Sequence, residues 1–247
     1  SALIRTSGQL PADRRYGAVA GYMKASKTPA RYYPVLAQSG TQEAVASLLD
    51  GFRSGNRDAA FAALLTVENP AMVNVLYDLA RRNPAWTDAA LARYTEFVTA
   101  SAGTGIRKYQ LYRQALELNP SPKIAVGILR KLEGIREFPA LVLAGRYLDD
   151  EATARAAAAA VKTIAAKSAR PLGGDTVRAL LEKSRDIYRE WAKSDADAGY
   201  AVDELTLMLS KLPAEGFVPA SLAPEAWKAV AGDPDARRAM KPKALAK

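Results

Sequence analysis

The stretch ALVLAGRYLDDEATARAAAAAVKTIAAK, residues 140–167, decides the fold. It opens with an apolar run, turns at Asp149-Asp150-Glu151, and continues as an alanine-rich segment. The spacing predicts a helix that opens at Asp150, with an apolar stripe made of Ala154, Ala157, Ala158, Val161, Ile164 and Ala165. Because nearly all of these side chains are small, neighbouring backbones can approach closely. We therefore expect this helix to be packed between other helices.

Helical periodicity continues through most of the chain. In residues 175–191 the inward face consists of Val177, Leu180, Leu181, Ser184, Ile187, Tyr188 and Trp191. Gly173-Gly174 interrupts the chain before this helix, and Asp175 is a good N-cap. Further helices are expected over about 42–53, 57–67, 105–118 and 197–212, and others are expected to start at Pro70, Thr87-Asp88, Ser121-Pro122 and Pro139. No strand pair is evident, so the sequence predicts an all-α fold.

Three segments share one layout: an apolar helix end, a short polar turn and a second amphipathic helix. They are residues 64–82, 115–135 and 140–166. One helix pair cannot bury its own apolar face, whereas stacked pairs form a continuous core. The layout predicts a right-handed α-solenoid, an α-α superhelix of antiparallel helix pairs. The expected domains are an N-terminal cap or extension over 1–40, a helical-repeat domain over 41–213, and a linker leading into a following domain over 214–247.

Cysteine and histidine are both absent from the 247 residues. Their absence excludes disulfides, thiolate metal sites, cysteine nucleophiles and a Ser-His-Asp triad, so catalysis would need a pair of carboxylates. We therefore predict no cofactor, no metal site and no catalytic residue in this chain. No apolar run approaches the roughly 20 residues of a membrane span. No signal peptide is visible either.

The net charge of +9 is unevenly distributed. Residues 1–35 carry six basic side chains against one acidic, and residues 228–247 carry six against two. Residues 36–227 carry 23 of each sign. A nucleic-acid groove would need a basic stripe along the helical body, so this distribution argues against nucleic acid as the partner.

Residues 140–167 resemble a HEAT repeat. In that family an apolar first helix ends in an Asp-containing turn, and a second helix presents a basic residue and an alanine-rich face. Asp149, Asp150, Arg155 and the run 156–160 match this pattern. The resemblance implies HEAT-like helix pairs. It extends less closely to residues 107–135.

Residues 216–247, GFVPASLAPEAWKAVAGDPDARRAMKPKALAK, are similar to the beginning of a 3-keto-disaccharide hydrolase (glycoside-hydrolase-like) domain. The matching positions are Gly216-Phe217, Trp227, Pro234, Arg237 or Arg238, Met240, Pro242 and Leu245-Ala246. Two departures are Ala226 in place of a glycine and residues 220–225 in place of an Asn-Gly turn. The resemblance implies the N-terminal part of a larger, exported, carbohydrate-active bacterial protein, hence a periplasmic or extracellular location. It brings no catalytic or sugar-binding residue with it.

The candidate binding residues are aromatic. Arg31, Tyr32 and Tyr33 place a cation beside two rings, which suits stacking on a base, a sugar or a peptide. The alternative is a cap over the first apolar face of the repeats. Trp86 is the fourth candidate. Its alternative role is structural, as a hydrophobic staple that packs against the start of the following helix. For the acidic turn 149–151, helix capping is favoured over cation binding.

The leading function is a non-catalytic interaction or spacer module of a larger carbohydrate-active (glycosyl hydrolase-like) protein, which predicts no deep pocket of convergent carboxylates. Its partner is expected to be another protein or a neighbouring domain of the same chain, with a glycan as a further candidate. The alternative is a HEAT-like nucleic-acid-binding module of the DNA glycosylase type, which would show a continuous basic groove.

Overall fold

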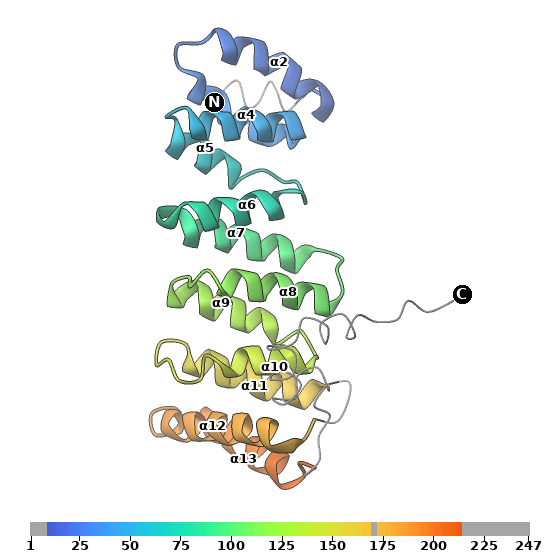
Figure 1. The fold of residues 1–247 in the computed structure, drawn as a ribbon, viewed down its shortest axis with the longest axis vertical. Coiled ribbons are helices and arrows are strands. Elements are labelled where there is room, and N and C mark those ends of the chain that lie inside the picture. The colour runs from blue at the N-terminus through green and yellow to red at the C-terminus, as the bar shows by residue number, and fades with distance from the viewer. Residues whose placement is uncertain (1–8, 169–171, 214–247) are drawn as a thin grey trace, which may run out of the picture. The chain divides into compact units, whose positions relative to one another are not determined.

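The computed structural model describes residues 9–168 and 172–213. Within them every regular element is helical, with twelve α-helices, two short 3₁₀ helices and no strand (Figure 1). The all-α prediction is confirmed. No helix in these described ranges has both the length and the apolar character needed to cross a membrane.

The chain divides into two compact units, residues 1–131 and residues 132–247. The first unit contains α2 (Ala12–Ala25), η1 (Pro29–Tyr32), α3 (Tyr33–Ser39), α4 (Gln42–Arg53), α5 (Arg57–Leu64), α6 (Met72–Arg82), η2 (Pro84–Trp86), α7 (Thr87–Ala100) and α8 (Gly105–Leu116). The second contains α10 (Phe138–Gly145), α11 (Ala154–Lys167), α12 (Gly174–Ala192) and α13 (Asp197–Ser210). Helix α9 (Pro122–Leu132) ends at the division between the units. The sequence had predicted no division at this point.

Within each unit, helices pack on their neighbours in sequence. In the first unit α3 contacts α2, α4 and α5, while α4 packs on α5, α6 on α7 and α7 on α8. In the second unit α10, α11, α12 and α13 pack in chain order. Short connections favour this packing of one helix on the preceding one.

The core of the first unit is formed by stripes spaced three and four residues apart. Helix α6 buries Met72, Leu76, Leu79 and Ala80, and α7 buries Ala90, Leu91, Tyr94 and Val98. The Tyr94 hydroxyl donates a 3.0 Å hydrogen bond to the carbonyl of Leu111, which joins α7 to α8. Burial raises the pKa of the Tyr94 phenol far above its ordinary value.

The alanine-rich helix α11 is packed between α10 and α12, as its small side chains predicted. It buries Ala157, Ala158, Ala160, Val161 and Ile164. A second close approach lies between α10 and α12. There a Cβ on Gly145 would overlap the methyl groups of Leu180. Small residues thus bring three successive helices close together.

Several predicted helix starts are wrong, including that of α6, which begins at Met72 rather than Pro70. Helix α11 begins at Ala154 rather than Asp150, because residues 150–153 form a turn in which the Ala154 N–H donates to the Asp150 carbonyl at 2.7 Å. Helix α12 begins at Gly174, whose φ of +82° suits glycine, and Asp175 lies in the first turn rather than at the N-cap.

The region 1–40 holds two helices that the periodicity did not predict, α2 and α3. In α2 only Val19 and Ala20 are core residues among those described, so no apolar stripe runs along the helix. In α3 nearly all side chains are buried, so apolar and polar positions do not alternate at helical spacing.

Candidate functional site

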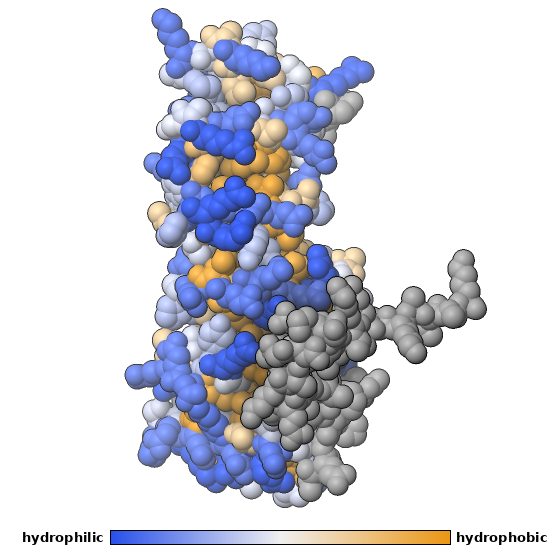
Figure 2. Space-filling model, viewed as in Figure 1, coloured by the Kyte–Doolittle hydropathy of each residue, from blue (hydrophilic) through white to orange (hydrophobic). Residues whose placement is uncertain are grey.

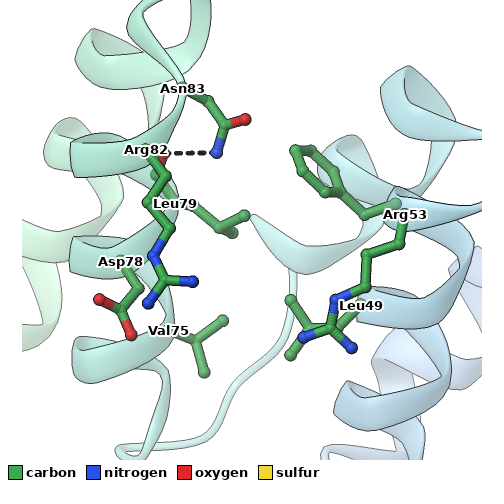
Figure 3. A pocket seen from close by; sticks show the side chains of 8 residues that line it. Leu49, Arg53, Val75, Asp78, Leu79, Arg82 and Asn83 are labelled. Carbon is green, nitrogen blue, oxygen red and sulfur yellow. Dashed lines mark hydrogen bonds between the residues drawn. The ribbon is translucent and has the colours of Figure 1, made fainter.

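A cleft of about 290 Å³ opens between α4 and α6 in the first unit (Figure 3). It is lined by Leu49, Phe52 and Arg53 from α4, and by Val75, Asp78, Leu79, Arg82 and Asn83 from α6 and its C-terminal end. Ligand pockets for drug-sized molecules span roughly 300–1,000 Å³, so this cleft suits a few side chains rather than a large cofactor.

Helical spacing builds both walls. On α4, Leu49 and Arg53 are four residues apart and lie one above the other. On α6, Val75, Leu79 and Arg82 follow the i, i+4, i+7 pattern of one face. Each wall therefore presents a row of apolar side chains, and the last residue of the row is an arginine.

The cleft has an apolar floor and a charged rim. Phe52 and Leu79 are buried at 7% and 6% exposure, and Leu49 and Val75 are half-buried above them. Arg53 and Arg82 are exposed, and they stand on opposite walls of the cleft (Figure 3). At the level of α5 and α6, Figure 2 shows apolar surface emerging between polar side chains.

The rim is basic. Arg53 pairs with Asp50 at 3.2 Å, and Asp78 pairs with Arg81 at 3.2 Å, all four side chains being more than half exposed. Arg82 makes no ion pair with any residue in the part of the chain that the structure describes. Exposed pairs of this kind contribute about 0–1 kcal/mol, so an incoming anion can displace them at little cost.

An aromatic cluster supports one end of the cleft. The Trp86 ring lies 5.0 Å from Phe52, nearly edge-on, and 5.3 Å from Phe61, nearly parallel. The Arg57 guanidinium lies 5.1 Å above both the Phe52 and the Trp86 rings. Arg57 also donates a 3.2 Å hydrogen bond to Asn83, whose amide donates to the Leu79 carbonyl at 2.9 Å. The cluster therefore fixes two residues that line the cleft, Phe52 and Asn83.

The predicted binding residues do not form one surface. Tyr33 is 2% exposed, with its phenol against Gly51 of α4, and it therefore belongs to the core. Arg31 is exposed, and its guanidinium lies 5.1 Å over the half-buried Tyr32 ring. Trp86 is half-buried and supports the cleft from behind Phe52 without lining it.

A shallower hollow of about 390 Å³ lies between α11 and α12 in the second unit. It is lined by Glu151, Ala154, Arg155, Lys183, Asp186, Ile187, Glu190 and Trp191. Its carboxylates are exposed and stand among cations. Asp186 pairs with Arg189 at 3.0 Å and Glu190 with Lys193 at 2.7 Å. In the described ranges no acidic side chains gather into a group able to hold a metal ion.

The acidic turn at the edge of this hollow has structural partners. The Asp150 carboxylate accepts a 3.0 Å hydrogen bond from the Ala152 N–H, and Asp149 pairs with Lys183 of α12. Trp191 stacks on Tyr188 with ring centroids 5.5 Å apart, and the Arg155 guanidinium lies 5.1 Å from its ring. The Asp149–Lys183 and Arg155–Trp191 contacts join α11 and the turn before it to α12.

Residue spacing did not mark Leu49, Arg53, Val75 and Arg82 as residues of a binding site. Their only signal is that each lies on the edge of an apolar stripe, where many surface residues also lie. Two such edges form a cleft only after α4 and α6 are placed side by side.

The chain matches no protein-family model, no curated protein and no solved structure. The residues that resemble the start of a hydrolase domain, 216–247 with Trp227, lie outside the described residues. The geometry and charge of the cleft between α4 and α6 are therefore the basis for the candidate site.

Proposed function

We propose that this chain is a non-catalytic, HEAT-like helical-repeat module that binds a segment of a partner protein in the cleft between α4 and α6. The observation that carries the proposal is the cleft itself, with half-buried Leu49 and Val75 over an apolar floor and arginines at the rim. Burial of such apolar surface contributes about 25 cal/mol per Å², and the polar rim fixes orientation.

A solenoid arrangement is part of this proposal. Its support is the packing of helices on their sequence neighbours within each unit, together with the alanine-rich helix between α10 and α12. In a solenoid each pair buries its apolar face against the next pair, and the grooves between successive helices bind partners.

A binding role is better supported than a catalytic one. General acid–base chemistry requires a group placed and tuned for proton transfer. The carboxylates of both hollows are exposed, and Asp78, Asp186 and Glu190 each lie beside a lysine or arginine. The further proposal that the module precedes a carbohydrate-active domain, in the periplasm or outside the cell, rests on the sequence resemblance alone.

Selection from a random dodecapeptide display library tests the proposal. The full chain is compared with Val75→Trp, which fills the cleft, and with Asn74→Trp, which adds the same side chain at an exposed neighbour that does not line it. We expect clones that bind the parent chain and Asn74→Trp but lose about tenfold or more in affinity for Val75→Trp, equivalent to about 1.4 kcal/mol. If no selected clone distinguishes Val75→Trp from the parent, the cleft is not a peptide site.

A further inference from the structure

The geometry of the cleft points to the chemistry of its occupant: we infer that the partner segment carries an acidic side chain next to an apolar one. The carboxylate lies between Arg53 and Arg82, and the apolar side chain enters over Leu49 and Val75. This inference rests on the proposed peptide-binding function and adds the class of peptide.

The two arginines are placed for an anion. They come from different helices and stand on opposite walls, so the opening of the cleft lies between them (Figure 3). Arg82 has no ion pair within the described ranges, and the partner of Arg53 is an aspartate at the exposed surface. A guanidinium presents donors in a planar fork that matches a carboxylate, which makes arginine the suitable side chain for this contact.

The floor distinguishes a peptide from a simple anion. Phosphate or a nucleic-acid backbone would use the arginines but would leave the apolar surface of Leu49 and Val75 in water. The cleft volume of about 290 Å³ is roughly ten times the ~30 Å³ share of one liquid water, enough for a leucine- or phenylalanine-sized group. An acidic residue next to an apolar one can pair with the arginines of the rim and cover the apolar surface of the cleft.

Asp78 places one negative charge among the lining residues. It is the only carboxylate among the described residues that line the cleft, and it lies one helical turn before Arg82 on α6. Its charge repels an acidic ligand placed at that end. Asp78→Asn, which removes this charge, should therefore strengthen binding.

The test uses the cleft-dependent clones of the library selection. Their sequences should be enriched in Asp or Glu beside Leu, Ile or Phe. One such peptide, labelled with fluorescein, is then titrated with the full chain and its variants by fluorescence polarisation. Arg53→Glu and Arg82→Glu should each weaken binding about tenfold or more, whereas Arg130→Glu, an equal charge change at an exposed site on α9, should leave it within about twofold.

The peptide is varied in parallel. Replacing its acidic residue with the neutral amide should remove the sensitivity to Arg82→Glu, and added salt should weaken the parent peptide more than the amide. Far-UV circular dichroism and thermal unfolding establish that each variant is folded.

The outcomes separate the two proposals. Clones that depend on Val75 but show no acidic enrichment, or bind Arg53→Glu and Arg82→Glu normally, overturn the inference and leave peptide binding intact. Absence of Val75-dependent clones overturns both. A labelled oligothymidylate that binds more tightly than the peptide, with the same arginine dependence, overturns the inference in favour of nucleic acid.

Discussion

The phenol of Tyr33 lies in the space that any side chain at position 51 would occupy. Tyr33 begins α3 and Gly51 is in the last turn of α4, so the missing side chain of one residue accommodates the ring of the other. This contact explains why an aromatic residue that resembled a binding platform belongs to the core.

Gly51→Ala should therefore destabilise the protein. Overpacking of a buried site costs about 1–3 kcal/mol and alanine gains roughly 1 kcal/mol over glycine in a helix, so we expect a net loss of up to about 2 kcal/mol. Gly127→Ala is the matched control, because a Cβ there meets nothing within 4 Å. Urea unfolding should show a lower free energy of unfolding for Gly51→Ala and a gain of up to about 1 kcal/mol for Gly127→Ala. Equal gains for both would contradict the contact.

The adjacent residues Leu48 and Leu49 should separate stability from binding. Leu48 is 0% exposed, and Leu48→Ala should cost about 2–5 kcal/mol. Leu49 is half-buried and lines the cleft, so Leu49→Ala should cost less than about 1.5 kcal/mol while weakening cleft-dependent peptides. Denaturant unfolding and peptide titration measure the two effects. Unchanged peptide affinity in folded Leu49→Ala would remove Leu49 from the site.

Trp191 should stabilise the second unit through its neighbours on α11 and α12. Trp191→Ala removes the stack on Tyr188 and the contact with Arg155. Aromatic pairs contribute about 0.5–1.5 kcal/mol beyond their apolar burial and exposed cation–π contacts about 0.5–1 kcal/mol, so we expect a loss of at least about 1–2.5 kcal/mol, to which the lost burial of the half-buried ring adds. Unfolding is followed by circular dichroism, since the substitution removes a fluorophore. Arg155→Ala should show only the cation–π part of the loss, and an equal loss in both variants would be inconsistent with this division.

Alkaline pH should destabilise the fold through buried tyrosines. Burial raises the pKa of the Tyr94, Tyr112 and Tyr188 phenols, so each favours its neutral form in the folded state. Their contribution to the free energy of unfolding is complete below the unfolded-state pKa of about 10. It is lost as the pH rises from there toward the pKa in the folded state.

Urea unfolding at several pH values between about 8 and 11.5 tests this effect against the ordinary tyrosine pKa of about 10. At neutral pH, Tyr94→Phe should lower the free energy of unfolding by about 1 kcal/mol, because it removes the hydrogen bond to Leu111. Above about pH 10, the free energy of unfolding of Tyr94→Phe should fall less steeply than that of the parent. Parallel curves for the two proteins would show that Tyr94 does not ionise with a raised pKa.

Several features followed directly from residue spacing. The range 42–53 was predicted without error, and the alanine stripe of α11 was correctly expected between two helices. Helix ends were less accurate. The turn after Asp150 depends on hydrogen bonds such as that from the Thr153 hydroxyl to the Tyr147 carbonyl at 3.0 Å, which a periodic pattern does not contain.

The sequence by itself determined that the described chain is helical, that helices such as α4, α6 and α12 carry an apolar stripe, and that catalysis cannot use cysteine or histidine. These properties are local or compositional, because a 3.6-residue period and an absent side chain are visible without any fold. Tertiary structure alone decided that Tyr33 is core, that Trp86 supports Phe52, and that Arg53 and Arg82 face one cleft. Such relationships join residues about 20 to 35 positions apart, and only the packing of one helix on another brings their side chains together.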